Sequence, residues 1–267
     1  TYEQTVYLER TLTSIAEQDR PPLEVIVTDD SATDAVEKLV RAMEGRLNAP
    51  LTYRRNTPSL GPPRNWNSAI DLARGEFVKI MHHDEWFSGP GALGAFVEAM
   101  DRTGADLAFC STAVHAVAKD HHWILQPSDE EVARIIADPP LLLLGNIIGA
   151  PSATIQRRSM EQRYDPAFQY LVDVDFYMRV IDAGLKVHRI DEVLINSVSD
   201  AGHNVTLDSK SAQVELREHL VLFERWKDRI PAAEKSRFHK SFFGLFAKYR
   251  ITSASDLRGI WPTWNGG

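Results

Sequence analysis

The order of apolar and polar positions predicts helices and short strands that alternate through the first 111 residues. Helical spacing of apolar side chains predicts helices over 6–16, 34–47, 64–74 and 92–102. Short apolar runs predict strands over 23–27, 51–54, 77–81 and 107–111. Alternation of this kind indicates an α/β fold, with a doubly wound, mostly parallel sheet flanked by helices.

Two later segments depart from this rhythm. Residues 115–149 contain a polar patch, an acidic helical stretch over 128–137 and the pair Pro139-Pro140, which indicates an insertion or lid. Beyond residue 211 the pattern is helical and mixed in charge. We therefore predict a first domain over 1–207 and a helical C-terminal extension over 208–267.

Composition narrows the class of protein. The 267 residues include 37 acidic and 30 basic side chains, and the net charge of −7 argues against the broad basic surface that a nucleic-acid partner needs. The single cysteine, Cys110, cannot form an internal disulfide. No apolar run approaches the roughly 18 residues of a membrane span, and the start does not resemble a signal peptide. These features predict a cytoplasmic protein.

Acidic residues follow two of the predicted strands, at the sheet edge where α/β proteins bind ligands. Asp29 and Asp30 come after Val25–Val27, although a turn with a helix cap explains them equally well. The second cluster is His82-His83-Asp84-Glu85. Imidazole and carboxylate together suit a divalent transition metal, and a solvated turn is the alternative.

A third acidic pair, Asp173 and Asp175, lies in an apolar segment. Desolvation there would raise a carboxyl pKa toward the range of a general base. The alternative is a helix start, where carboxylates favour the positive end of the helix dipole.

Taken in this order, the segments resemble family 2 glycosyltransferases of the GT-A fold, which are inverting enzymes that use nucleotide-diphosphate sugars. The similarity covers roughly residues 1–200. The segments that carry it are Tyr7-Leu8-Glu9-Arg10-Thr11-Leu12, Glu24 to Asp34, Gly61 to Asn67, Ala73 to Phe77, Pro151-Ser152 and Asp173 to Arg179.

The resemblance implies a nucleotide site and a catalytic base. Asp30 would hydrogen-bond the nucleobase, Thr1 and Tyr2 would border the same pocket, and Arg64 would contact the nucleotide. Asp173 matches the family's catalytic base, although Val172 replaces the Glu that usually precedes it.

The resemblance also implies a divalent cation that bridges the donor diphosphate. Asp84 occupies the last position of the family's Asp-X-Asp motif and Glu85 follows it, but His82 stands where the first Asp is usual. Imidazole is a poor ligand for Mg²⁺ and an acceptable one for Mn²⁺, so the replacement favours Mn²⁺.

Two further comparisons with the family concern the ends of the matched region. Members usually open with an apolar strand before the Thr-Tyr pair, whereas this chain begins at Thr1. Either the chain is truncated or that strand is absent, and in both cases we expect the central sheet to lack a buried strand. His203 falls where related enzymes carry a His near the diphosphate, with a surface His as the alternative.

The expected function is inverting transfer of a sugar from a nucleotide-diphosphate sugar, with UDP as the first expectation, to an acceptor hydroxyl in bacterial surface glycan synthesis. The acceptor would be a glycan or lipid-linked. Residues 138–148 would shape the acceptor site or touch the inner face of the membrane, unless they form a buried helix contact. Two rivals stay open: a sugar nucleotidyltransferase, and a sugar-nucleotide binding protein without turnover, since His82 and Val172 replace expected acids.

Overall fold

The computed structural model describes residues 1–199 and 211–262. Its α-helices are α1 (Val6–Ala16), α2 (Ala35–Met43), α3 (Pro62–Leu72), α4 (Ala92–Thr103), α5 (Asp129–Ala137), α6 (Val172–Asp182), α8 (Arg217–Trp226), α9 (Lys235–Lys248) and α10 (Ala254–Ile260). Its strands are β1 (Val25–Asp29), β2 (Leu51–Arg55), β3 (Phe77–Val78), β4 (Glu85–Phe87), β5 (Leu107–Ala116), β6 (His121–Leu125), β7 (Thr154–Arg157) and β8 (Val187–Ser199). Every helix and strand predicted within the first 111 residues is present, with ends that differ by a few residues.

The large sheet has the strand order β3-β7-β5-β8-β4, and β6 pairs with β5 beside this path. The α/β prediction is confirmed, but the sheet is mixed rather than mostly parallel. Among the described strands, β5–β8 is the only neighbouring pair within it that is parallel; β7 and β6 are antiparallel to β5, β3 is antiparallel to β7, and β4 is antiparallel to β8. The parallel expectation counted strands joined by helices, whereas β6 returns directly from β5 through a short turn, as antiparallel strands can.

The N-terminal end of the molecule is a second, smaller sheet. Among the described residues, β1 and β2 pair in parallel with each other and with no strand of the large sheet. Thr1 lies beside the end of β1, because its amino group donates to the Thr28 carbonyl at 2.8 Å and Asp30 N donates to the Thr1 carbonyl at 3.0 Å.

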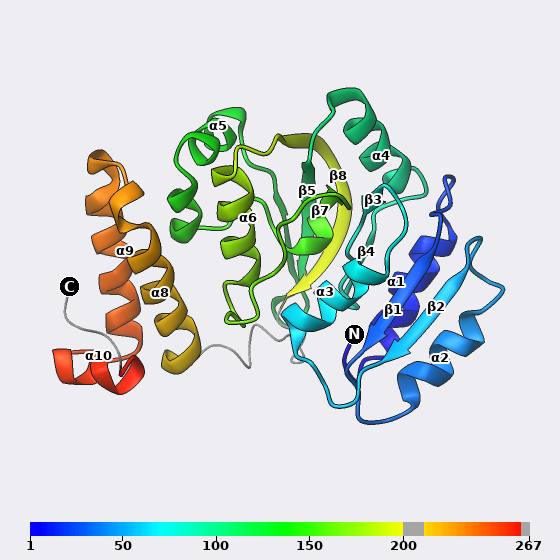
Figure 1. Cartoon of the computed structure of the whole chain (residues 1–267), viewed down its shortest axis with the longest axis horizontal. Coiled ribbons are helices and arrows are strands. Elements are labelled where there is room, and N and C mark those ends of the chain that lie inside the picture. The colour runs from blue at the N-terminus through cyan, green and yellow to red at the C-terminus, as the bar shows by residue number, and fades with distance from the viewer. Residues whose placement is uncertain (200–210, 263–267) are drawn as a thin grey trace.

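The elements follow one another across the molecule in distinct layers (Figure 1). The C-terminal helices α8, α9 and α10 form one end, α5 and α6 come next, the large sheet lies in the middle, and β1 and β2 with α1 and α2 form the other end. Helix α6 lies within the largest apolar cluster, and Phe176, Tyr177 and Met178 are fully buried there. Burying each such side chain stabilises the fold by about 1.5–3 kcal/mol.

The segment 115–149 is built into this core. Its first part extends β5 into the β5–β6 hairpin, and α5 begins at Ser128 with a capping box to Glu131. The 3-10 turn Pro139–Leu144 then buries Pro139 to Leu143 against α6, α8 and α9. The buried contact that we weighed against a lid or membrane contact is therefore the one observed.

The C-terminal extension is helical, as predicted. The boundary predicted at 207/208 falls outside the described residues and remains a prediction. No helix within residues 1–199 and 211–262 combines the length and the apolar character that crossing a bilayer requires.

Candidate functional site

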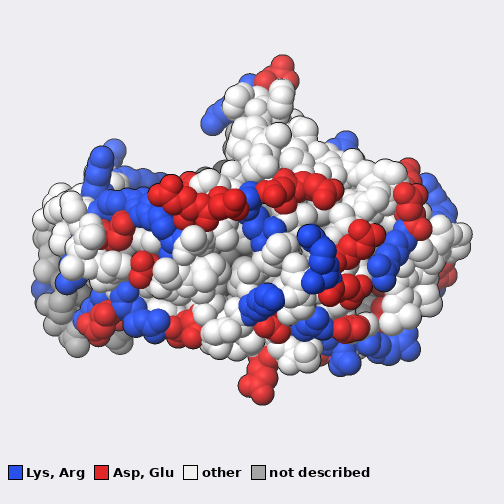
Figure 2. Space-filling model, turned by 90° about the horizontal axis from the view of Figure 1, so that it is seen from above, with Lys and Arg blue, Asp and Glu red and all other residues white. Residues whose placement is uncertain are grey.

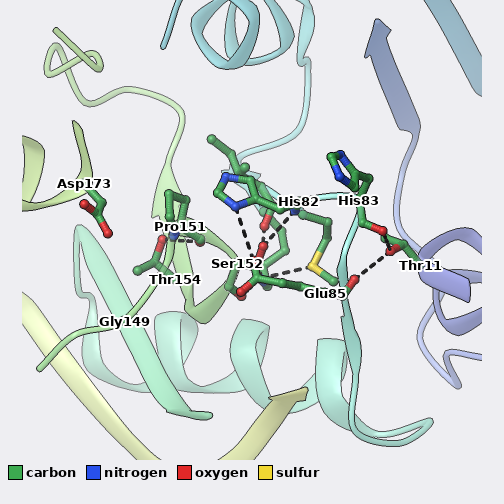
Figure 3. A network of polar contacts seen from close by, with 12 residues as sticks. Thr11, His82, His83, Glu85, Gly149, Pro151, Ser152, Thr154 and Asp173 are labelled. Carbon is green, nitrogen blue, oxygen red and sulfur yellow. Dashed lines mark hydrogen bonds and ion pairs between the residues drawn. The ribbon is translucent and has the colours of Figure 1, made fainter. Parts of the chain in front are cut away.

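Helix α1 and the 3-10 turn η3 (Pro151–Ala153) hold the segment with the predicted metal ligands between them (Figure 3). The Thr11 hydroxyl of α1 lies 2.7 Å from the Glu85 carbonyl oxygen and 2.9 Å from that of His83. On the other side, His82 N donates to the Ser152 hydroxyl at 2.8 Å. Contacts from two elements distant in sequence thus fix the backbone of this turn.

The side chains of His82 and Glu85 meet inside this turn, with Nδ1 and Oε2 3.4 Å apart. Glu85 is 3% exposed, and burial raises the pKa of its carboxyl group, although hydrogen bonds from Ser152 and Ser197 act in the opposite direction. Burial likewise lowers the pKa of His82. Both shifts favour the uncharged forms, so the buried pair gains most from a cation that compensates the carboxylate.

The side chains of this turn supply only part of the ligand set that a divalent cation needs. His82 Nε2 and Glu85 Oε2 are buried and make no hydrogen bond within the described residues. Asp84 is partly exposed, and its charge acts on His82, whose pKa it raises against the larger effect of burial. Yet no three His, Cys, Asp or Glu side chains in 1–199 and 211–262 converge as a ready-made metal site. Any cation here needs further ligands from a bound molecule.

Asp173 lies in the first turn of α6, with its carboxylate facing the Gly149 loop (Figure 3). Its Oδ2 accepts a hydrogen bond of 2.8 Å from Asn146 Nδ2, and its Oδ1 accepts one of 2.9 Å from Val174 N. The residue is partly exposed and forms no ion pair among the described side chains. Desolvation raises the pKa of the carboxyl group to about 6, against the lowering effect of these hydrogen bonds. A carboxylate of this kind is suited to accept a proton near neutral pH.

Asn146 fixes the position of Asp173 from a neighbouring loop. Its amide group also donates to the Gly149 carbonyl at 3.0 Å, and its Oδ1 accepts from the backbone N–H groups of Ile148 and Gly149, each at 3.1 Å. Tyr177 of α6 donates to the same Gly149 carbonyl at 3.1 Å. The loop and the helix are therefore joined at the carboxylate.

Asp175, predicted together with Asp173, serves a different purpose. It is fully buried, and its two oxygens bind Arg179 Nε at 2.7 Å and Arg225 Nη1 at 2.6 Å. Arg225 lies on α8, so the ion pair joins α6 to the C-terminal helices. Asp175 is therefore a structural residue. Both acids lie in the first turn of α6, which is the position that the helix-start alternative gave them.

A buried carboxylate from α8 holds the start of α6. Glu218, which is 2% exposed, accepts hydrogen bonds from the backbone N–H groups of Gln169, Tyr170 and Leu171 at 2.7, 2.9 and 2.8 Å. These N–H groups lie just before the first turn of α6. A negative charge is favoured at this N-terminal end of a helix. The C-terminal helices thereby set the place of the turn that carries Asp173.

The residues predicted to bind a nucleotide lie at the C-terminal end of β1. Asp30 is buried, and its carboxylate accepts hydrogen bonds from Asn56 Nδ2, Leu60 N and Gly61 N at 2.8, 3.1 and 2.9 Å. Asp30 therefore closes the loop before α3. Tyr2 and Arg64 are exposed, and Arg64 has no hydrogen bond or ion pair with the described residues.

Charges in the three predicted segments influence one another. The charges of Asp29 and Asp30 act on the Thr1 amino group, and that amino group in turn acts on His82. The charge of Glu85 raises the pKa of Asp173 in addition to the effect of desolvation. Pairwise charge effects thus connect Asp30 to Thr1, Thr1 to His82 and Glu85 to Asp173, and the convergence of the three acidic segments at one site remains a prediction.

Sequence reasoning missed three residues that shape this site: Asn146, Ser152 and Glu218. Ser152 belongs to a segment that resembles the family but was given no role. Asn146 follows Gly145, where the sequence predicts only a turn. Glu218 lies in a polar helix, and no local sequence pattern distinguishes it as a site residue. His203 lies outside the described residues.

Comparison with known proteins agrees with this architecture. The family model described as "Glycosyl transferase family 2" matches residues 1–164. Abequosyltransferase RfbV of Salmonella typhimurium is 36% identical over 87 residues, which are 32% of this chain and 26% of that protein. The GalNAc(5)-diNAcBac-PP-undecaprenol beta-1,3-glucosyltransferase of Campylobacter jejuni is 32% identical over 98 residues, 37% of this chain and 31% of that protein. The chain thus spans about a third or less of the length of these two curated relatives.

Solved structures show the same fold. The structure of Staphylococcus aureus TarS 1–349 in complex with UDP-GlcNAc superposes with a TM-score of 0.68 at 18% identity, over 97% of this chain and 76% of that one. This likeness establishes a GT-A type fold. Because the family model covers 164 of the 267 residues, the chain belongs to glycosyl transferase family 2.

Proposed function

We propose that this chain is an inverting glycosyltransferase that moves a sugar from a nucleotide-diphosphate sugar to an acceptor hydroxyl. Family membership supports the reaction class. The observation that carries the proposal is Asp173, an acid with a pKa raised to about 6 that faces the same site as the buried His82–Glu85 turn.

In this reaction Asp173 accepts the proton of the acceptor hydroxyl while that oxygen attacks the anomeric carbon from the face opposite the leaving diphosphate. Asn146 holds one oxygen of Asp173 and leaves the carboxylate oriented toward the site. A positioned general base typically contributes about 10² to 10⁴ in rate. Val172 in place of the usual acid does not remove this function, because Asn146 and the Val174 N–H orient the carboxylate.

The nucleotide would bind at the end of β1. Asp30 holds the loop over 60–61 and presents its remaining lone pairs to a base, with Thr1 and Tyr2 beside it. Arg64, exposed in the first turn of α3, makes no side-chain hydrogen bond or ion pair with the described residues and would reach the nucleotide.

A divalent cation would be held by Asp84 and Glu85, with His82 as the third group. The unpartnered buried atoms of His82 and Glu85 support this assignment, and a neutral imidazole favours Mn²⁺ over Mg²⁺. When bound, the cation neutralises charge that develops on the leaving diphosphate. The incomplete ligand set predicts that donor and cation bind together.

The donor we propose is a UDP-sugar, in line with the UDP-GlcNAc complex of TarS. The acceptor we propose is a glycan or lipid-linked glycan of a bacterial surface polymer, in line with the undecaprenol-linked substrate in the name of the Campylobacter relative.

The test is nucleotide release from a panel of UDP-, GDP-, dTDP- and CDP-sugars, with and without hydroxyl acceptors. We expect acceptor-stimulated release of UDP that EDTA abolishes and Mn²⁺ restores better than Mg²⁺. Pyrophosphate release from a nucleoside triphosphate and a sugar phosphate would instead establish a nucleotidyltransferase. Tight nucleotide binding with no turnover across all acceptors would show a binding protein.

A further inference from the structure

Helix α9 presents an outer face unlike the rest of this acidic protein. Its sequence, Lys-Ser-Arg-Phe-His-Lys-Ser-Phe-Phe-Gly-Leu-Phe-Ala-Lys over 235–248, contains no Asp or Glu, although the whole chain has a net charge of −7. Phe243 is 71% exposed at the middle of the helix. The helix therefore combines cationic side chains with an aromatic ring in solvent.

The exposed side chains of α9 lie on one stripe, which we call the α9 outer face. Steps of three or four residues along the helix from Phe243 connect the exposed residues Ser236, His239, Lys240, Ala247 and, just past the helix, Arg250, whereas Phe246 at the edge of this stripe is partly buried. Phe238 is buried and Phe242 is partly buried on the opposite side. Phe243 thus lies outside the apolar contacts that hold the helix.

Two cations of the α9 outer face are not neutralised by the protein. Within the described residues, Lys240 and Arg250 form no ion pair, whereas Arg237 and Lys248 of the same helix bind Glu234 and Glu215. Helix α9 stands, with α8 and α10, at one end of the molecule (Figure 1). In Figure 2, basic side chains lie beside uncharged and a few acidic ones at that end. Among the described residues, none buries the Phe243 ring, which is 71% exposed.

We propose that the α9 outer face docks the protein on an anionic lipid surface, with the Phe243 ring inserted at the headgroup boundary. Lys and Arg beside an exposed aromatic ring are the pattern of interfacial helices, where apolar burial and attraction to anionic lipids act together. A protein partner would need complementary acids and more apolar area than one ring supplies.

This inference stands apart from the proposed reaction, since it rests on charge and exposure at the end opposite β1 and β2. Where both hold, they reinforce each other, because a lipid-linked acceptor would be met at the surface on which the protein docks. Failure of vesicle binding leaves glycosyl transfer to a dissolved acceptor untouched. Failure of turnover leaves vesicle binding untouched.

The experiment is sedimentation of the full chain with vesicles of phosphatidylcholine, with and without phosphatidylglycerol. We expect binding only to the anionic vesicles and its loss at high salt. The variant Lys240→Glu should weaken the partition constant by more than about fivefold, since each cation near an anionic surface contributes on the order of a factor of five. Phe243→Ser should weaken it by about tenfold through lost apolar burial.

Matched controls lie at the other end of the molecule. Leu23→Ser removes a side chain that is 67% exposed, and Arg20→Glu reverses an exposed cation without an ion pair in the described structure. Both should bind vesicles like the wild type. All four positions are exposed, so unchanged thermal melting should accompany each change.

Equal binding by all variants, or no binding to anionic vesicles, overturns the proposal. A shift from dimer to monomer in Phe243→Ser without vesicle binding would show instead that the face joins two copies of this chain. Salt-sensitive binding of nucleic acid in place of vesicles would likewise refute a lipid partner.

Discussion

The two sides of the site are held in different ways. At the end of β1, Asp30 is fixed by Asn56, Leu60 and Gly61, which all belong to the strand and loop that follow it. At the start of α6, Asp173 depends on Asn146 from the preceding insertion, while Glu218 and Arg225 of α8 anchor the surrounding helix. The proposed nucleotide side is thus local in the sense that one continuous stretch, from β1 to the start of α3, builds it, whereas the proposed catalytic side also draws on the insertion and on the C-terminal helices.

The acids also differ in the partners that hold them. Asp30 accepts three hydrogen bonds from the loop before α3, and Asp175 binds two arginines. Asp173 accepts two hydrogen bonds but binds no cation in the described structure. Desolvation raises the pKa of Asp173 and of Asp175, so the two acids differ in their partners: arginines for Asp175, an amide and a backbone N–H for Asp173.

The largest effect is expected from Asp173→Asn. Loss of the proton acceptor should reduce acceptor-dependent nucleotide release by about 10² to 10⁴, with little change in the melting temperature. The assay is turnover at saturating donor and acceptor, with circular dichroism as the check on folding. Wild-type turnover would remove Asp173 from the mechanism.

The neighbouring substitution Asp175→Asn should mainly lower stability, whereas Asp173→Asn mainly lowers turnover. Breaking the buried contacts to Arg179 and Arg225 should lower the free energy of unfolding by about 3 kcal/mol, the low end for a buried pair because both arginines keep partial exposure to water. Denaturant unfolding measures this loss. A variant as stable as the wild type would mean that the ion pair does not join α6 to α8.

Glu218→Gln tests whether the C-terminal helices position the start of α6. Removing the charge from three backbone hydrogen bonds should cost about 2 kcal/mol of unfolding free energy. If Glu218 positions Asp173, kcat should also fall below that of a control of equal stability loss, while the KM for the donor stays constant. A kcat no lower than in that control would reduce Glu218 to a purely structural residue.

Asp30→Asn is the smallest of these changes and concerns the local side. The amide can keep part of the hydrogen bonding to Leu60 and Gly61, so about 1 kcal/mol of stability should be lost. We expect the KM for the nucleotide sugar to rise more than kcat falls. Isothermal titration with UDP gives an independent reading, and unchanged affinity would exclude Asp30 from the nucleotide site.

The local side is also the side that the sequence predicted well. The helix over Val6–Ala16 and the acids after β1 follow from apolar spacing and from where apolar runs stop. The mixed sheet was not predictable in the same way, because β4 has three residues and β7 four, too short to give a period. Asn146 and Glu218 act through contacts across 27 and 47–49 residues, which no local pattern encodes.

The most direct test of the central claim is the pH dependence of kcat/KM, compared between the wild type and Asp173→Asn. Because the base works only when deprotonated and its pKa is raised to about 6, wild-type kcat/KM should be high at pH 7 to 8 and fall as the pH drops through about 6. The variant should be slow throughout and lack this inflection. An inflection near pH 6 that persists in Asp173→Asn would contradict the account, because another group would then be the base.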